Sequence, residues 1–157
     1  MARTTPLVTL LTDFGYADPY VAAMKGVLLA ATPRAQVVDI SHAIPPQNVP
    51  AAGFVLAQAA PYFPAETLHV VVVDPGVGTD RRILAARVGG QRVLFPDNGV
   101  ITFLAQRLPL EQLVVVSNTR YLPSPGGVSA TFHGRDIFAP VAGHILNGVP
   151  LAQLGPQ

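Results

Sequence analysis

The sequence predicts an α/β domain in which a mostly parallel central sheet carries helices on both faces. Apolar, β-rich runs alternate along the chain with stretches of strong helix formers, a pattern typical of α/β layers. Residues 68–73 (LHVVVV) are continuously apolar, as expected for a strand that is covered on both faces. The length of 157 residues and the hydrophobic share of 50% suit one compact domain with a substantial core.

Two strand–helix pairs are expected in the first part of the chain. Residues 6–12 (PLVTLLT) form a β-rich apolar run that Asp13-Phe14-Gly15 interrupts. Asp18-Pro19 offers a capping carboxylate and a proline at the first helical position, so a helix is expected through residue 31. Residues 36–41 (QVVDIS) predict a second strand, and residues 48–60 predict a second helix that Pro61 helps to end.

The remaining elements follow the strand at residues 68–73. Residues 83–88 and 92–95 flank Gly89-Gly90-Gln91 and predict a hairpin. Residues 118–130 are rich in Pro, Gly and Ser and predict a loop. The other predicted elements are a helix at residues 98–106, a strand at 113–116 and a final helix at 134–146, followed by Gly148.

Composition excludes several classes of function. The formal net charge is +1 and no Lys/Arg cluster occurs, so nucleic acid is not an expected partner. Cysteine is absent, which excludes disulfides, thiolate zinc sites and cysteine nucleophiles. Residues 1–5 lack the plan of a signal peptide and no apolar run is long enough to span a bilayer, so we expect no membrane association and a cytoplasmic protein. Only 12% of residues are charged, which hints at apolar surface for an oligomer or a partner domain.

Carboxylates follow the predicted strands at their C-terminal ends, where ligands of open α/β sheets bind. A carboxylate can accept hydrogen bonds from both hydroxyls of a ribose and attracts a sulfonium or an amine. Any one of these residues could instead cap a turn. The set comprises Asp13, Asp39 with Ser41, Asp74, and Asp97 with Asn98.

A second cluster of reactive side chains begins the last predicted helix. Phe132-His133-Gly134-Arg135-Asp136 places an imidazole, a guanidinium and a carboxylate at a helix N-terminus, which favours anions and lowers the pKa of a nearby histidine. The alternative is that Arg135 and Asp136 simply cap and pair locally. His42 could line the crevice, whereas His69 and His144 are expected to be structural or exposed.

Other motifs give weaker signals. Asp13-Phe14-Gly15 has the letters of a kinase metal motif, but the accompanying kinase motifs are absent. Gly76-Val77-Gly78 lacks the third glycine and following helix of a dinucleotide loop. No Gly-x-Ser-x-Gly elbow occurs. Asp13, Asp74, His133 and Asp136 could converge on a metal, but no HxH, HxxxH or HExxH spacing supports this, so neither a metal nor another cofactor is expected.

Five motifs together resemble the S-adenosylmethionine hydroxide adenosyltransferases, relatives of the fluorinases and chlorinases. The resemblance covers nearly the whole chain in the same order. Its parts are Thr12-Asp13-Phe14-Gly15 with Asp18, Tyr20 and Lys25-Gly26; Val38-Asp39-Ile40-Ser41-His42; Val73-Asp74-Pro75-Gly76-Val77-Gly78-Thr79 with Arg81-Arg82; Phe95-Pro96-Asp97-Asn98-Gly99; and Thr131-Phe132-His133-Gly134-Arg135-Asp136-Ile137-Phe138-Ala139-Pro140.

The resemblance implies hydrolysis of S-adenosylmethionine to adenosine and L-methionine by attack of water or hydroxide at C5′. The water-activating Asp-Arg-His set of the family would fall on Asp74, Arg81 and His133, with the neighbouring Arg82 as the alternative arginine. The resemblance also implies that Asp13 binds the ribose and that the remaining substrate-binding residues are Asp18, Phe132 and Gly134. Halogenases differ at Asp74, Val77 and Gly134, where they carry a tyrosine-threonine pair and a serine, and this points to water rather than halide.

The resemblance further implies a homotrimer, in which the active site lies between the N-terminal domain of one subunit and a C-terminal β-barrel domain of its neighbour. Residues 1–157 are expected to form the N-terminal domain alone, without that β-barrel domain, which a separate partner chain could supply. The alternative function is a non-catalytic remnant that oligomerises and binds a nucleoside. A metal-dependent phosphoesterase ranks third.

Overall fold

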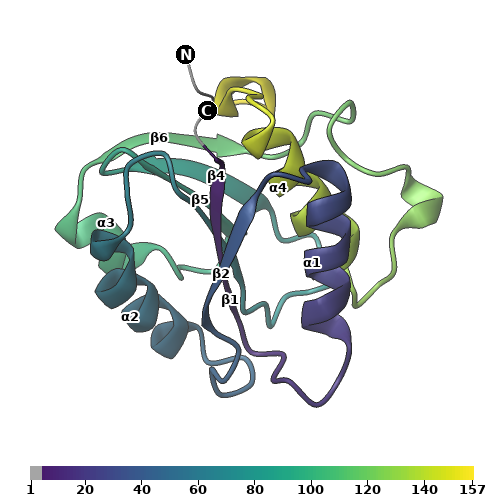
Figure 1. Ribbon diagram of the computed structural model, residues 1–157, viewed down its shortest axis with the longest axis horizontal. Helices are drawn as coiled ribbons and strands as arrows, with labels where there is room; N and C mark the ends of the chain where they lie inside the picture. The colour runs from purple at the N-terminus through teal and green to yellow at the C-terminus, as the bar shows by residue number, and fades with distance from the viewer. Residues whose placement is uncertain (1–4) are drawn as a thin grey trace.

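The computed structural model describes residues 5–157 and contains a six-stranded sheet with strand order β2-β1-β3-β5-β4-β6 (Figure 1). Strand β1 pairs in parallel with β2 and β3, and β3 pairs in parallel with β5. Strand β4 is antiparallel to both of its neighbours, β5 and β6. The predicted α/β fold with a mostly parallel sheet is therefore confirmed. The strands are β1 (Leu7–Thr12), β2 (Gln36–Ser41), β3 (Leu68–Val72), β4 (Ile83–Val88), β5 (Gln91–Pro96) and β6 (Leu110–Val115).

Helices cover both faces of the sheet (Figure 1). Helices α1 (Tyr20–Ala31) and α4 (Ala139–Leu146) pack together on one face, and α2 (Val49–Ala59) and α3 (Thr102–Arg107) pack together on the other. Short 3-10 turns occupy Ala60–Tyr62, Pro125–Gly127 and Leu151–Gln153. No helix within residues 5–157 is both long and apolar enough to cross a bilayer.

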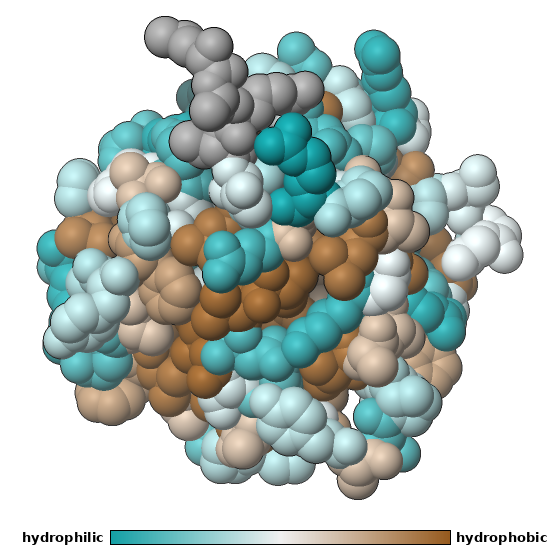
Figure 2. Space-filling view, viewed as in Figure 1, coloured by the Kyte–Doolittle hydropathy of each residue, from teal (hydrophilic) through white to brown (hydrophobic). Residues whose placement is uncertain are grey.

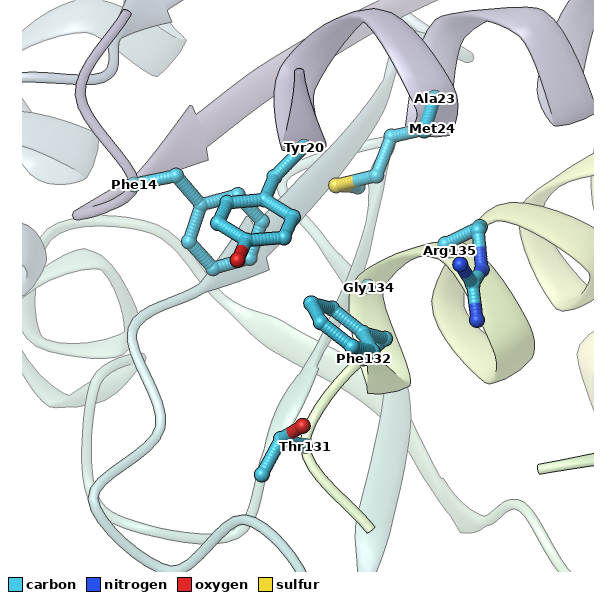
Figure 3. Close-up of a pocket in the computed structure, with 8 residues that line it drawn as sticks. All are labelled: Phe14, Tyr20, Ala23, Met24, Thr131, Phe132, Gly134 and Arg135. Atoms are coloured by element: carbon cyan, nitrogen blue, oxygen red, sulfur yellow. The ribbon is translucent and has the colours of Figure 1, made fainter. Parts of the chain in front are cut away.

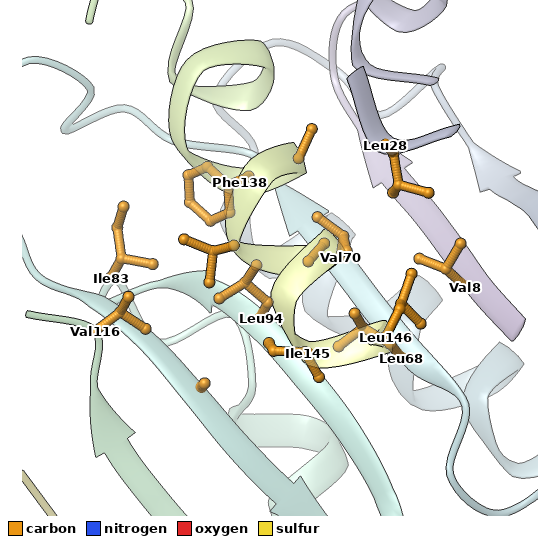
Figure 4. Close-up of a cluster of buried hydrophobic side chains, with 14 of the residues drawn as sticks. Val8, Leu28, Leu68, Val70, Ile83, Leu94, Val116, Phe138, Ile145 and Leu146 are labelled. Carbon is orange, nitrogen blue, oxygen red and sulfur yellow. The ribbon is translucent and has the colours of Figure 1, made fainter. Parts of the chain in front are cut away.

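Alternation along the central strands divides the core into two clusters, one on each face. In β3, Leu68 and Val70 face the α1–α4 layer, where they meet Leu28 and Phe138 (Figure 4). The intervening Val71 faces the α2–α3 layer. Because both faces of β3 are buried, apolar side chains occupy both of them, and His69 is the one polar residue of this strand.

Several element ends differ from the prediction by one residue, and three differences at helix or strand starts have a structural meaning. Helix α1 begins at Tyr20 with Pro19 at the N-cap, and no side chain caps it, so the expected capping role of Asp18 is wrong. Helix α3 begins at Thr102 rather than residue 98, because Asn98 uses its side chain to bond Val73 O and Val100 N in a turn. Strand β6 begins at Leu110, three residues earlier than predicted. Residues 1–4, which include most of the stretch considered for a signal peptide, lie outside the described part of the chain.

The last predicted helix contains a change of winding. Gly134–Phe138 forms a π-helical turn, and α4 follows from Ala139. Pro140 lacks an N–H and its ring would clash with the carbonyl of residue 136 in a continuous α-helix. The wider turn in front of Pro140 relieves this conflict, and such turns are frequent at functional sites.

Candidate active site

Two acidic side chains meet at the C-terminal edge of the sheet. Strands β1 and β3 are parallel neighbours with Thr12 beside Val72, so Asp13 and Asp74 follow adjacent strand ends. Both line a polar pocket of about 190 Å³. His133 and Gly134 also line this pocket. The full lining is Asp13, Phe14, Gln47, Val72, Asp74, Val77, Thr131, His133 and Gly134.

Asp74, Arg81 and His133 form one connected group. Arg81 Nε donates to Asp74 Oδ2 over 2.7 Å, and Arg81 Nη2 lies 2.6 Å from the same oxygen. Arg81 Nη2 also lies 2.7 Å from His133 Nδ1. Arginine is always a donor, so Nδ1 accepts and the neutral ring carries its proton on Nε2. The predicted Asp-Arg-His set is thus brought together, with Arg81 rather than Arg82.

The group is shielded from solvent, and one of its acceptors is free. The side chain of Asp74 is 4% exposed and that of Arg81 is 12% exposed. Asp74 Oδ1 is buried and accepts no hydrogen bond from residues 5–157. A buried carboxylate oxygen without a donor is costly. Asp74 Oδ1 therefore suits a ligand or water that brings an O–H group.

A tight turn returns Arg81 to Asp74. Val77 N donates to Asp74 O over 3.2 Å, and Thr79 Oγ1 donates to Gly76 O over 2.6 Å. Gly78 has φ +79°, and a Cβ there would lie 2.8 Å from Ala130 O. Only glycine fits this left-handed position against the backbone of the 118–130 loop. The glycines of the Asp74–Thr79 motif therefore shape the turn.

His133 is held in its neutral form. Burial lowers the pKa of His133, and the positive charge of Arg81 lowers it further, while Asp74 acts in the opposite direction with a smaller effect. The expected direction of the shift agrees with the structure, but its main causes are burial and Arg81. The lowered pKa favours the neutral imidazole, which can accept the Arg81 hydrogen bond at Nδ1.

Asp13 is fixed by the loop that follows β2. Asp13 Oδ2 accepts a hydrogen bond of 2.7 Å from Gln47 N. Gln47 reaches this position with φ 62°, an uncommon conformation for a residue other than glycine. The other carboxylate oxygen remains available to the pocket. Gln47 contributes through its backbone, so no side-chain signal in the sequence could have identified it.

An apolar pocket of about 280 Å³ adjoins the polar one and shares Phe14, Thr131 and Gly134 with it. Figure 3 shows the rings of Phe14, Tyr20 and Phe132 around this space, with the Met24 thioether beside them. The Tyr20 and Phe132 ring centroids are 5.0 Å apart. The Arg135 guanidinium lies 5.0 Å from the Phe132 centroid, at cation–π distance.

Gly134 allows these walls to approach each other. A Cβ at residue 134 would lie 2.9 Å from Met24 Sδ and 3.1 Å from the Phe14 ring. The expected placements of Phe132 and Gly134 beside the pocket agree with this geometry. Met24 and Ala23 also line the apolar pocket, and no motif or spacing in the sequence marks them.

Several other candidates lie elsewhere. Asp97 pairs with Arg82 over 2.6 Å, and Asp39 pairs with Lys25 over 2.6 Å. Asp18 is exposed and lines neither pocket, so its substrate-binding role stays a prediction. The local alternative holds for Arg135 and Asp136, which bond to each other over 2.6 Å, although Arg135 also lines the apolar pocket.

The histidines other than His133 are structural or lie away from the pockets. His42 is buried beneath the crevice rather than lining it. His69 is buried between Thr9 and Gln91, and His144 packs against Tyr121. Across residues 5–157, the His, Asp and Glu side chains form no group of three that could hold a metal ion.

Comparison with known proteins assigns the family. Residues 8–155 match the family model described as the SAM hydroxide adenosyltransferase N-terminal domain. The chain belongs to this family. An (R)-S-adenosyl-L-methionine hydrolase of Salinispora tropica is 48% identical over 97% of this chain and 58% of the relative. A protein of the same name from Thermus thermophilus is 44% identical over 96% of this chain and 60% of the relative.

More distant and structural relatives agree with this assignment to the SAM hydroxide adenosyltransferases. A fluorinase of an Actinoplanes species is 26% identical over 98% of this chain and 59% of that protein. A crystal structure of an uncharacterized conserved protein from Thermotoga maritima matches with a TM-score of 0.90 and 39% identity, over 95% of this chain and 58% of that chain. The chain thus spans 53–60% of the length of the (R)-S-adenosyl-L-methionine hydrolases that it matches.

Proposed function

We propose that this SAM hydroxide adenosyltransferase domain hydrolyses S-adenosyl-L-methionine to adenosine and L-methionine. The observation that carries the proposal is the buried Asp74–Arg81–His133 group, whose Asp74 Oδ1 has no donor from residues 5–157 at the polar pocket. Relatives that are 41–48% identical carry the name (R)-S-adenosyl-L-methionine hydrolase, which supports the same activity and the R configuration at sulfur.

In the proposed reaction, a water molecule donates one hydrogen bond to Asp74 Oδ1 and attacks C5′ of the adenosyl group. The new O–C5′ bond forms as the C5′–S bond breaks, and the electron pair of that bond goes to sulfur. Methionine leaves as a neutral thioether, so its departure needs no acid. One water proton stays in the 5′-hydroxyl of adenosine, and the other passes to Asp74 and then to solvent.

Arg81 and His133 act by positioning and charge balance. Arg81 bonds Asp74 Oδ2 through Nε, which leaves Oδ1 as the oxygen directed to water. His133 accepts from Arg81 Nη2 and thereby fixes the guanidinium plane. In this proposal Asp13, whose Oδ2 accepts from Gln47 N, accepts hydrogen bonds from the ribose hydroxyls. Most of the rate enhancement comes from orienting the attacking water and the substrate and from excluding bulk water around them.

Water is favoured over halide as the nucleophile. Asp74 is a carboxylate at the pocket, and a carboxylate repels a small anion but accepts a proton from water. Val77 offers an apolar wall where a halide would need hydroxyl or amide donors. The chain is also more similar to the named hydrolases than to the named fluorinases, at 41–48% against 25–26% identity.

The test incubates the purified protein with each sulfonium epimer of S-adenosylmethionine and quantifies adenosine and methionine by chromatography. Equimolar products from the R epimer are expected, and Asp74→Ala should lower the rate at least about 100-fold, the scale of a lost general base. Adenosine affinity should change little in Asp74→Ala. Binding without hydrolysis in the unsubstituted protein would contradict the proposal and favour a non-catalytic nucleoside-binding module.

We also propose that the working unit is a homotrimer whose pocket is completed by a β-barrel domain, on the same or a separate chain. The resemblance to the family supports this, as does apolar surface: Tyr62 is 89% exposed and Phe54 is 57% exposed. Figure 2 shows apolar side chains gathered on the face that carries the edge strand β2, where Val37, Val38 and Ile40 are half-buried. Light scattering at micromolar concentration should give three times the chain mass, and a monomer would contradict the proposal.

A further inference from the structure

Lys25, Asp39 and His42 belong to the family-like motifs, yet none of them lines either pocket described above. His42 is 1% exposed and lies directly beneath the loop that leaves β1. Its Nδ1 atom lies 2.7 Å from Thr12 Oγ1, and its Nε2 atom lies 3.0 Å from Asp39 Oδ1. Asp39 Oδ2 in turn accepts from Lys25 Nζ over 2.6 Å. Together these contacts connect helix α1, the edge strand β2 and the end of β1.

The direction of each hydrogen bond in this network follows from which of its atoms can donate. The Asp39 carboxylate that faces His42 Nε2 can only accept, so Nδ1 is the acceptor of a neutral His42 ring. The Thr12 hydroxyl, which accepts from Phe14 N over 3.2 Å, therefore donates to Nδ1. The His42 ring then carries its proton on Nε2, which faces Asp39, although the two atoms are not aligned for a strong hydrogen bond. Burial raises the pKa of Asp39, but the Lys25 hydrogen bond and the close approach of His42 outweigh burial and leave that pKa below its ordinary value. Asp39 is therefore the negatively charged end of this hydrogen-bond network.

The backbone of His42 makes a second contact with the same loop. Gly15 N donates to His42 O over 2.7 Å. Asp13 thus lies between two anchors, Thr12 on one side and Gly15 on the other, and both anchors are on His42. Phe14, the wall shared by the two pockets, has its N–H held by Thr12 Oγ1.

We propose that His42 is a positioning residue of the substrate site, which holds Asp13 and Phe14 in place through the Thr12 hydroxyl. This inference rests on the proposed function, because it assigns Asp13 to the ribose. The Lys25–Asp39 pair orients the imidazole from behind. The ordinary alternative is that His42 only stabilises the fold.

Three substitutions separate these roles. His42→Asn can place an amide oxygen near the Nδ1 position and keep the Thr12 bond, whereas His42→Leu removes it. His144→Asn, on helix α4, is the matched control for losing an imidazole elsewhere. The probe is adenosine, titrated into labelled protein and followed by amide NMR, which measures weak binding and the Phe14 and Gly15 amides in the same spectra.

His42→Leu should weaken adenosine binding roughly ten-fold, the scale of one lost hydrogen bond, while His42→Asn recovers most of the affinity. In a protein that already carries Asp13→Ala, His42→Leu should weaken adenosine binding by less than a further factor of about two, because the carboxylate that His42 positions is already gone. The Phe14 amide should exchange faster with solvent in His42→Leu than in His42→Asn or His144→Asn.

Failure of the proposed function and failure of the positioning role of His42 give different results. If the unsubstituted protein neither binds adenosine nor hydrolyses S-adenosylmethionine, the proposed function fails, and the positioning of a nucleoside site fails with it. If adenosine binds but His42→Leu weakens binding equally with and without Asp13, His42 acts only on the fold and the positioning role is overturned. An unchanged Phe14 amide in His42→Leu overturns it as well.

Discussion

Arg81 and Arg82 are adjacent in the sequence but have different environments in the structure. Arg81 is 12% exposed and bonds both Asp74 and His133. Arg82 is 62% exposed, and its guanidinium bonds Asp97. Successive side chains of an extended segment point to opposite sides, so Arg81 and Arg82 face different surroundings before β4. Motif spacing favours Arg81 with Arg82 as the alternative, and the different environments of the two side chains in the fold separate them.

We expect Arg81→Lys to lower the rate of S-adenosylmethionine hydrolysis at least about ten-fold, because an ammonium cannot hold Asp74 and His133 in one planar fork. The matched substitution Arg82→Lys should leave the rate within roughly two-fold, since a surface pair contributes little. Chromatographic rates for the two variants check this. Equal losses would contradict the separate roles of the two arginines.

At the scale of elements, sequence patterns located every strand and α-helix within residues 5–157, but only some of their ends. The β-rich runs predicted β1 to β5 to within one residue at each end, because apolar periodicity reflects burial directly. The start of α3 was missed because it depends on Asn98 bonding Val73 O, a tertiary contact. The π turn at Gly134–Phe138 was missed because it arises from Pro140 within a packed helix. Asp39 and His42 were placed at the right strand end, yet the structure directs them beneath the loop instead of into the crevice.

Two glycines inside helices give opposite predictions for the same substitution. Gly26 of α1 is exposed, and a Cβ there would meet no atom within 4 Å. Gly53 of α2 faces α3, and its Cβ would lie 2.7 Å from the backbone oxygen of Val100. Helix propensity favours alanine over glycine at both sites, so only packing distinguishes them.

Gly26→Ala should therefore raise the free energy of unfolding by about 0.5–1 kcal/mol. Gly53→Ala should lower it by roughly 1–3 kcal/mol, because α2 must move away from the turn before α3. Urea unfolding of both variants measures the difference. Stabilisation by Gly53→Ala would show that the α2–α3 contact is looser than the structure indicates.

For the whole molecule, the buried sheet contains a histidine that links stability to pH. His69 lies in the middle of the sheet on β3 and is completely buried. Thr9 Oγ1 lies 2.7 Å from its Nδ1, and Gln91 Oε1 lies 3.2 Å from its Nε2, so the neutral ring is satisfied by one donor and one acceptor. Burial lowers the pKa of His69 from 6.5 to about 4, against a smaller opposing effect of Gln91.

The folded protein should consequently lose stability as the pH falls from about 6.5 to about 4. In that window the unfolded chain binds a proton at His69 and the folded chain does not, so acid favours unfolding. The loss attributable to His69 is on the order of 3 kcal/mol and is complete below the folded pKa. His69→Gln keeps polar groups between Thr9 and Gln91 but cannot titrate. Urea unfolding at pH 7, 5.5 and 4 should show a weaker pH dependence of the free energy of unfolding in His69→Gln. The same pH dependence in both proteins would mean that His69 is protonated without opening the sheet.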